Sequence, residues 1–242
     1  LSLPMVATKH EVHDFGSIYK ERHIGDLLHH ERDGEQIIER TRQELGSAAF
    51  SAQYQQQPLA DDGGMVRPWW FGRYAQPPEE MRIVQSWDTA IKAGAKNDAS
   101  VCMTFGEYQG KSYVLDASAM RCEYPDLKRA VYMLAERWKP HAMLIEDKAS
   151  GQQLLQDIKR ESYLPVIAVK PRHDKVTRFA AVSAMIEAGK VSLPERAGWL
   201  CDFEEELLTF PHGNHDDYVD CLTQYLDWVR SGMFVKLGIR TL

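Results

Sequence analysis

The chain has 242 residues, of which 44% are hydrophobic and 26% are charged, so it can form one sizeable domain with an appendage. Its net charge of −6 argues against a generic nucleic-acid coat. It contains no apolar run near the ~20 residues that a membrane span needs, and residues 1–5 lack the charged start and long apolar core of a signal peptide.

The first 60 residues differ in character from the rest of the chain. Helical periodicity predicts a helix over Glu35–Leu45, and Gly46 suits its C-terminal cap. The sequence ADDGG at 60–64 is typical of a linker, and Pro77–Pro78 indicate a turn before the first clear strand. Because the chain lacks an initiator Met, we expect it to be a fragment of something longer.

From residue 81 onward, hydrophobic periodicity predicts strands and helices in a regular order. Three strands come first, and Gln109–Gly110 suit a tight hairpin between the second and the third. The expected elements are strands at 82–88, 99–108 and 111–118, a helix at 126–138, a strand at 141–146, a helix at 150–161, a strand at 165–169, a helix at 174–188, a short element at 191–194, and helices at 199–208 and 217–229. This order predicts an α/β fold, a mixed sheet flanked by helices in the ribonuclease H-like arrangement.

Acidic residues stand at three separated places in this order. Asp88 ends the first strand, Glu146 ends the fourth, and Asp216–Asp217 open the last helix. Two of these acids close apolar runs, where an ionised side chain costs free energy unless a partner neutralises it. A ribonuclease H-like sheet brings these three elements to one edge, so the pattern predicts a metal site there.

Each acid also has an ordinary structural interpretation. Asp88 could simply terminate a strand, and Glu146 could lie in a solvated turn. For an isolated Asp–Asp pair such as Asp216–Asp217, a favourable position at a helix N-terminus would be the better explanation. Because all three clusters fall on the elements that the site requires, we favour the metal site.

The chemistry that this set of acids suits is phosphodiester hydrolysis. Two divalent ions about 3.5–4 Å apart can activate water, stabilise the phosphoryl charge and assist the leaving oxygen. Mg²⁺ prefers carboxylate and water oxygens, so we expect two ions of Mg²⁺ or Mn²⁺. Asp88 is expected to bridge them, with Glu146 on one ion and Asp217 on the other. Asp216 could ligate an ion or lie behind the ligands, and the choice between Asp216 and Asp217 stays open, with Asp217 favoured.

Other polar residues are weaker candidates. His215 could shuttle a proton or contact the phosphate, whereas for Asp98 a turn role ranks ahead of a metal role. The acidic run at 202–206 is expected to be an exposed helix face. On charge alone, DNA contact and a plain solvated surface are equally good interpretations of the basic residues between 148 and 178; the candidates for DNA contact are Lys148, Lys170, Arg172, Lys175 and Arg178.

Nucleotide binding is not expected, because the sequence contains no G-x-x-x-x-G-K-[ST] loop. The four cysteines form no C-x-x-C pair, which argues against a zinc knuckle. Free thiols in a reducing cytosol are the simpler interpretation.

Several motifs are specific when they occur together, although any one alone would be weak. They are SWDTA at 86–90, LIEDKASG at 144–151, DKVTR at 174–178 followed by GKV at 189–191, FPHGNHDDYVD at 210–220, and FSAQYQQQP at 50–58. Together they resemble the large terminase subunit of tailed bacteriophages and prophages, the motor-nuclease that packages viral DNA. The resemblance extends over nearly the whole chain.

The resemblance implies that residues 81–242 form a ribonuclease H-like, metal-dependent endonuclease, which in this family cuts concatemeric DNA into genome lengths. It implies that residues 1–60 are the C-terminal remnant of an ATPase domain and that 61–80 are a linker. The implied partners are double-stranded DNA and, in the packaging motor, the portal and the small terminase subunit. The implied location is the cytoplasm of the bacterial host, with no membrane partner.

Two alternatives remain. Another ribonuclease H-like nuclease, of the Holliday-junction resolvase type, would cut branched DNA and would leave residues 1–80 without an explanation. A non-catalytic assembly module that docks on the portal or small subunit would have no need to keep three acids together.

Overall fold

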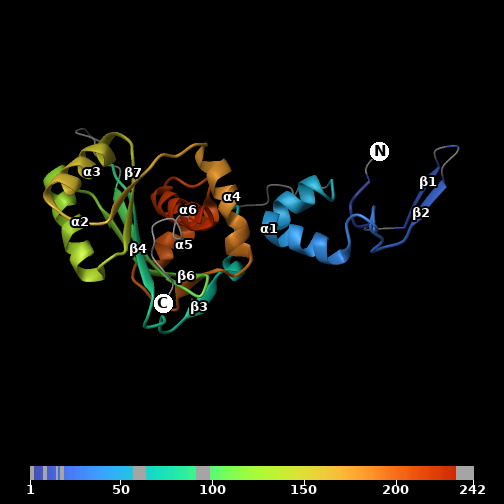
Figure 1. Cartoon of the computed structure of the whole chain (residues 1–242), viewed down its shortest axis with the longest axis horizontal. Coiled ribbons are helices and arrows are strands. Elements are labelled where there is room, and N and C mark those ends of the chain that lie inside the picture. Colours follow the sequence, from blue (N-terminus) through green and yellow to red (C-terminus); the bar gives the residue numbers. More distant parts are fainter. Residues whose placement is uncertain are drawn as a thin grey trace. The chain divides into compact units, whose positions relative to one another are not determined.

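The computed structural model describes residues 3–7, 10–14, 16, 19–56, 64–90 and 99–232. The chain divides into two compact units, Leu1–Asp62 and Gly63–Leu242, whose elements are labelled in Figure 1. Within the described residues, none of the helices combines the length and hydropathy that a membrane span requires. Asp98, a weak candidate in the sequence, lies outside the described residues.

The N-terminal unit contains a hairpin and a broken helix. Strands β1 (Glu11–Asp14) and β2 (Tyr19–Arg22) pair antiparallel, and helix α1 (Glu35–Gln53) packs through Ile38 and Phe50 onto Met5. Gly46, with φ 77°, interrupts α1 where the sequence predicts a helix end. Sequence analysis did not predict the hairpin, because its strands, EVHD and YKER, lack a hydrophobic alternation.

The C-terminal unit is built on a seven-stranded mixed sheet. Its strands are β3 (Gly72–Tyr74), β4 (Arg82–Asp88), β5 (Ser100–Tyr108), β6 (Lys111–Met120), β7 (Ala142–Glu146), β8 (Val166–Val169) and β9 (Val191–Pro194). The order across the sheet is β3-β9-β6-β5-β4-β7-β8. Strands β4, β5 and β6 form an antiparallel meander, whereas β7 and β8 extend the sheet in parallel beyond β4.

Helices cover both faces of this sheet (Figure 1). They are α2 (Tyr124–Trp138), α3 (Ala149–Glu161), α4 (Lys175–Glu187), α5 (Leu200–Thr209) and α6 (Asp217–Arg230), with a 3₁₀ turn, η1, at Pro68–Trp70. Residues along each central strand alternate between two cores. Val84 and Leu144 pack in the core with α4, α5 and α6, while Trp87 and Met143 pack in the core with α2 and α3. The α/β fold class expected from the sequence is therefore confirmed.

The segment at 61–80 differs from the expected linker. From residue 64 onward it belongs to the C-terminal unit, where Val66 and Phe71 are buried in the larger core. Strand β3 pairs with β9 at the edge of the sheet. Glycines and prolines suggested a linker, but the apolar side chains between them give this segment enough burial to fold onto the sheet.

Gln224 connects α6 to the sheet. Its amide is buried, and its Nε2 donates to Ser86 Oγ at 2.9 Å and to the carbonyl oxygens of Trp87 and Leu144, both at 3.3 Å. These partners lie on β4 and β7, immediately before the two strand ends that carry Asp88 and Glu146. The contact therefore sets the distance between α6 and both strand ends.

Substitution Gln224→Leu is expected to lower the free energy of unfolding of the C-terminal unit by about 1–3 kcal/mol, since a buried hydrogen-bonding network loses its donor. Urea unfolding followed by tryptophan fluorescence measures this, because all six tryptophans lie in that unit. Gln156→Leu, on the exposed side of α3, is the matched control and should change stability by less than about 0.5 kcal/mol. Equal losses in both variants would contradict the assignment.

Candidate active site

Asp88 is the last residue of β4, an inner strand between β5 and β7. Burial raises the pKa of this carboxyl to about 7, together with the negative charges of Asp220, Glu146 and Asp217, while the Lys175 ammonium opposes the rise. Acids from a strand end, a second strand end and a helix therefore act on one another through a shared, poorly solvated site. Such a group favours either a proton or a bound cation.

Glu146 occupies the equivalent position on β7. The two strands are parallel and Trp87 pairs with Ile145, so their next residues, Asp88 and Glu146, leave the sheet at the same edge. Glu146 Oε1 is buried and takes no hydrogen bond of ordinary geometry; it forms an ion pair with the Lys148 ammonium. Behind it, a Cβ at Gly151 would lie 1.9 Å from the Glu146 carbonyl oxygen, so only glycine fits there.

Helix α6 delivers its acids to the same edge. Asp216 is the N-cap residue and Asp217 the first helical residue, where the positive end of the helix dipole favours carboxylates. The Lys175 ammonium lies 2.7 Å from Asp216 Oδ1 and 2.7 Å from Asp220 Oδ2. Burial and then the charge of Asp216 raise the pKa of Asp217. Asp216 is thus already engaged by a cation from α4.

Asp220 is an acid of this site that the sequence analysis did not select. Its carboxylate is buried one helical turn after Asp216 and Asp217, and Arg178 donates to its Oδ1 at 3.0 Å. Burial raises the pKa of Asp220, and the contacts with Lys175 and Arg178 oppose that rise. The signal was present, since residues three and four apart share a helix face, but burial at position 220 could not be read from the sequence.

The structure places the expected DNA-contacting basic residues differently from one another. Lys175 and Arg178 are counter-ions of the α6 acids, and the Arg178 side chain is only 12% exposed. Lys148 contacts Glu146, and Lys170 lies 3.3 Å from Asp147. Arg172 is exposed. A count of charges along the sequence cannot detect the ion pairs that form between separate elements.

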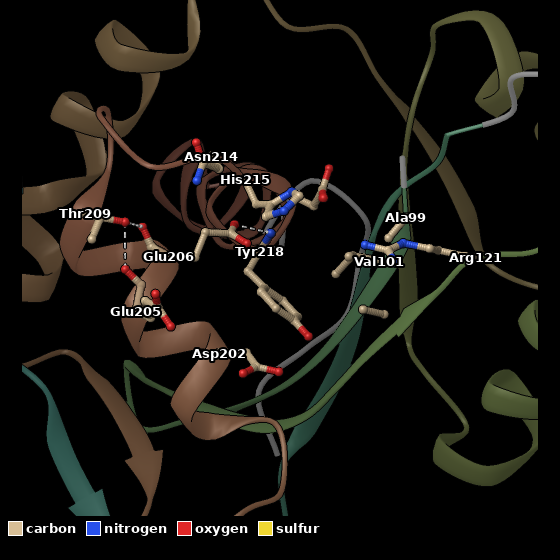
Figure 2. Close-up of a pocket in the computed structure, with 12 residues that line it drawn as sticks. Ala99, Val101, Arg121, Asp202, Glu205, Glu206, Thr209, Asn214, His215 and Tyr218 are labelled. Carbon is tan, nitrogen blue, oxygen red and sulfur yellow. Dashed lines mark hydrogen bonds between the residues drawn. The ribbon is translucent and has the colours of Figure 1, made fainter. Parts of the chain in front are cut away.

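A pocket of about 320 Å³ adjoins Asp217 (Figure 2). Its rim includes His215, a weaker candidate from the sequence, and Arg121 at the end of β6. Most of its charged lining is acidic and comes from α5, including Asp202 and Glu205. The pocket is therefore an extension of the acidic edge rather than a separate basic groove.

Glu206, on α5, holds the start of α6. It accepts from the backbone N–H groups of Tyr218 at 2.7 Å and Val219 at 3.0 Å. Burial raises its pKa to about 7, although these two backbone hydrogen bonds oppose the rise. The sequence analysis expected the run 202–206 to be exposed, but Phe203 and Glu206 point inward. Glu206 fixes the direction in which Asp217 leaves the helix.

The donor set fits hard divalent cations. Asp88, Glu146 and Asp217 offer only carboxylate oxygens, which Mg²⁺ and Mn²⁺ prefer, and Glu146 Oε1 is a buried acceptor with no hydrogen bond. In the described residues, His10, Glu21 and His23 are the one group of three potential ligands whose ligand atoms all lie within 4.8 Å. The acids are therefore more widely spaced than one ion requires, as a pair of ions would need.

Glu206→Ala is expected to lower the free energy of unfolding by about 2–4 kcal/mol, because two buried N–H groups at the start of α6 lose their acceptor. Glu206→Gln keeps a carbonyl oxygen and should cost less than about 1 kcal/mol. Urea unfolding monitored by tryptophan fluorescence measures both. Glu205→Ala, on the exposed face of α5, is the control; a loss in Glu206→Ala no larger than in this control would refute the role.

Comparisons with known proteins agree with this geometry. A family model described as the terminase RNaseH-like domain matches residues 85–227, more than half of the chain. No curated protein matches. The full large terminase of a thermophilic bacteriophage, in its crystal form 2, is similar with a TM-score of 0.62 at 10% identity, over 81% of this chain and 52% of that one.

The large terminase nuclease from thermophilic phage G20c is also similar. Its structure with bound zinc gives a TM-score of 0.50 at 16% identity, over 63% of this chain and 83% of that one. Its structure with bound magnesium gives 0.50 at 14%, over 62% and 82%. At these identities the similarity concerns the fold, and this chain spans about half (52%) of the full large terminase. Because the family model covers most of the sheet and the site, the chain belongs to the terminase RNaseH-like domain family, and the resemblance to the C-terminal nuclease domain of a large terminase is confirmed.

Proposed function

We propose that this chain is a metal-dependent DNA endonuclease that cuts concatemeric phage DNA during genome packaging. The observation that carries the proposal is the convergence of Asp88, Glu146 and Asp217 from three elements on one buried sheet edge. Nothing in the packing of the core requires these acids to be together, and their mutual repulsion opposes it. The G20c terminase nuclease, which has a similar fold, has been crystallised with bound zinc and with bound magnesium.

In the proposed mechanism, Asp88 bridges two Mg²⁺ or Mn²⁺ ions, Glu146 holds one and Asp217 the other. Bound there, the ions would supply an activated water and stabilisation of the charge on the phosphoryl and leaving oxygens. Asp217 is favoured over Asp216 because Lys175 already pairs with Asp216. His215, on the rim of the pocket beside Asp217, is placed to contact the phosphate or to move a proton.

DNA would approach the acidic edge across the exposed cations around it. Lys148 and Lys170 have side chains that are 65% and 79% exposed, and Arg172 is exposed as well. These residues follow the ends of β7 and β8, the same edge that carries Glu146. Phosphate contact by a few side chains suits binding with little sequence preference.

The remaining assignments also rest on the family. Residues 1–60 are proposed to be the end of an ATPase domain, with no nucleotide bound by this chain. The portal and the small terminase subunit are the proposed protein partners, and packaging would place all of them in the bacterial cytoplasm.

Nicking and linearisation of supercoiled plasmid tests the proposal. We expect cleavage with Mn²⁺ or Mg²⁺ and none with EDTA. Asp88→Ala, Glu146→Ala and Asp217→Ala should each lower the rate by about 100-fold or more, since even residues behind metal ligands often account for 10–100-fold. Asp227→Ala, an exposed acid at the far end of α6, should cut like the wild type. Wild-type rates in all three site variants would overturn the two-metal assignment.

A binding measurement separates an inactive nuclease from an assembly module. In EDTA at pH 8, Asp88→Asn is expected to raise the free energy of unfolding by about 1–3 kcal/mol, because it removes one buried charge from an acidic cluster. Adding Mn²⁺ should stabilise the wild type but not this variant. Thermal and urea unfolding with Asp227→Asn as control would measure this. A variant less stable than the wild type in EDTA, together with no metal effect on either protein, would refute a metal site.

A further inference from the structure

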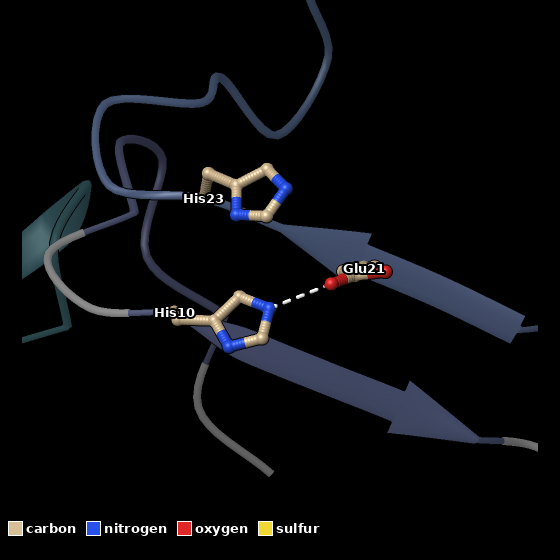
Figure 3. Close-up of side chains that lie close together, drawn as sticks. All are labelled: His10, Glu21 and His23. Carbon is tan, nitrogen blue, oxygen red and sulfur yellow. Dashed lines mark hydrogen bonds and ion pairs between the residues drawn. The ribbon is translucent and has the colours of Figure 1, made fainter.

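A second group of ligand-type side chains lies on the hairpin of the N-terminal unit, away from the acids described above. His10 directly precedes β1, Glu21 lies within β2, and His23 directly follows it. One ligand atom from each of these residues lies within 4.8 Å of those of the other two. Figure 3 shows the two imidazoles side by side with the Glu21 carboxylate at their edge.

The strand register explains why these three residues meet. Glu11 pairs with Arg22, so the next step of the register places His10 opposite His23. Glu21 and His23 are two residues apart and therefore share one face of the hairpin. The other face is fixed by Arg22, which is buried, lies 3.2 Å from Glu11 and donates to the carbonyl oxygens of Pro4 and Asp26.

The side chains are held in place by one another. His10 Nε2 lies 2.8 Å from Glu21 Oε1, and the rings of His10 and His23 stack with centroids 5.0 Å apart and planes 9° apart. The stacking keeps both imidazoles on one side of the hairpin. The carboxylate is thus positioned beside two nitrogen donors, with solvent on the open side, since all three residues are exposed.

We propose that His10, Glu21 and His23 form a binding site for a divalent transition-metal ion of the zinc type. Two imidazole nitrogens and one carboxylate oxygen are a ligand set that Zn²⁺ accepts, with water completing a four-coordinate site. Imidazole donors favour Zn²⁺, Co²⁺ or Ni²⁺ over Mg²⁺, which prefers oxygen. The site therefore differs in metal preference from the oxygen-only edge of the C-terminal unit.

A metal at this position would link the two ends of the hairpin. An isolated two-stranded hairpin has marginal stability in water, and β1 and β2 have four residues each. Because His10 precedes one strand and His23 follows the other, a shared ion would close the open end opposite the turn. Its effect would be to stabilise the N-terminal unit without any contribution to phosphodiester chemistry.

Calorimetric titration of the whole chain with Zn²⁺, in a large excess of Mg²⁺ that saturates the oxygen-only site, tests the proposal. We expect one Zn²⁺ equivalent that persists in an Asp88→Ala background. His10→Ala and His23→Ala should each weaken it by at least about 10-fold, and Glu21→Gln should weaken it while keeping the size of the side chain. Co²⁺ should give visible absorption typical of four-coordinate nitrogen and oxygen ligands, and this absorption should be lost in the same variants.

His30→Ala is the matched control, because His30 is an exposed histidine of the same unit outside the cluster. It should bind Zn²⁺ like the wild type. Circular dichroism of each variant checks that the fold is retained. The proposal is overturned if the wild type shows no Mg²⁺-resistant Zn²⁺ equivalent, or if His10→Ala and His23→Ala bind as tightly as His30→Ala. Plasmid cleavage is not a readout of this site, so failure here leaves the nuclease proposal unaffected.

Discussion

The structure of the C-terminal unit depends on holding like charges together at one poorly solvated edge. Asp88, Glu146, Asp217 and Asp220 interact strongly enough that burial and their mutual repulsion raise the pKa of Asp88 to about 7. An arrangement of this kind costs free energy in the absence of a cation. It persists because the elements that carry the acids are fixed by contacts made elsewhere: two strand ends by the parallel pairing of β4 with β7, and one helix by its packing on the sheet.

Helix α6 is held at three levels along its length. Glu206 accepts from the backbone N–H groups of its first turn. Gln224, two turns further, donates to β4 and β7. Beside it, the ring of Tyr225 stacks on Phe105 with centroids 3.9 Å apart, and its hydroxyl lies 3.0 Å from Ser112 Oγ. The polar contacts select one rotation and one height for the helix, which nonspecific apolar packing alone would not do.

Patterns within one element were readable from the sequence, whereas relations between elements were not. The strand Arg82–Asp88 and the start of α6 at Asp217 lie where hydrophobic periodicity and acidic residues predicted them. The roles of Asp220 and Glu206 were missed because both depend on burial beneath a second helix. Arg178 was expected on a DNA-facing surface for the same reason, since its partner is 42 residues away. The hairpin at Glu11–Arg22 was missed because it is stabilised by a buried ion pair rather than by alternating apolar residues.

The motif DKVTR at 174–178, noted in the sequence without a stated role, has a structural explanation. Asp174 caps α4 by accepting from the Thr177 N–H at 3.0 Å, which fixes where the helix begins. Lys175 and Arg178 are three residues apart and therefore share the face that meets α6. Together they neutralise Asp220, and Lys175 also engages Asp216. Asp220 is thus a brace whose charge is already balanced within the protein, whereas Asp88 retains a raised pKa and remains the carboxylate whose charge most needs a cation.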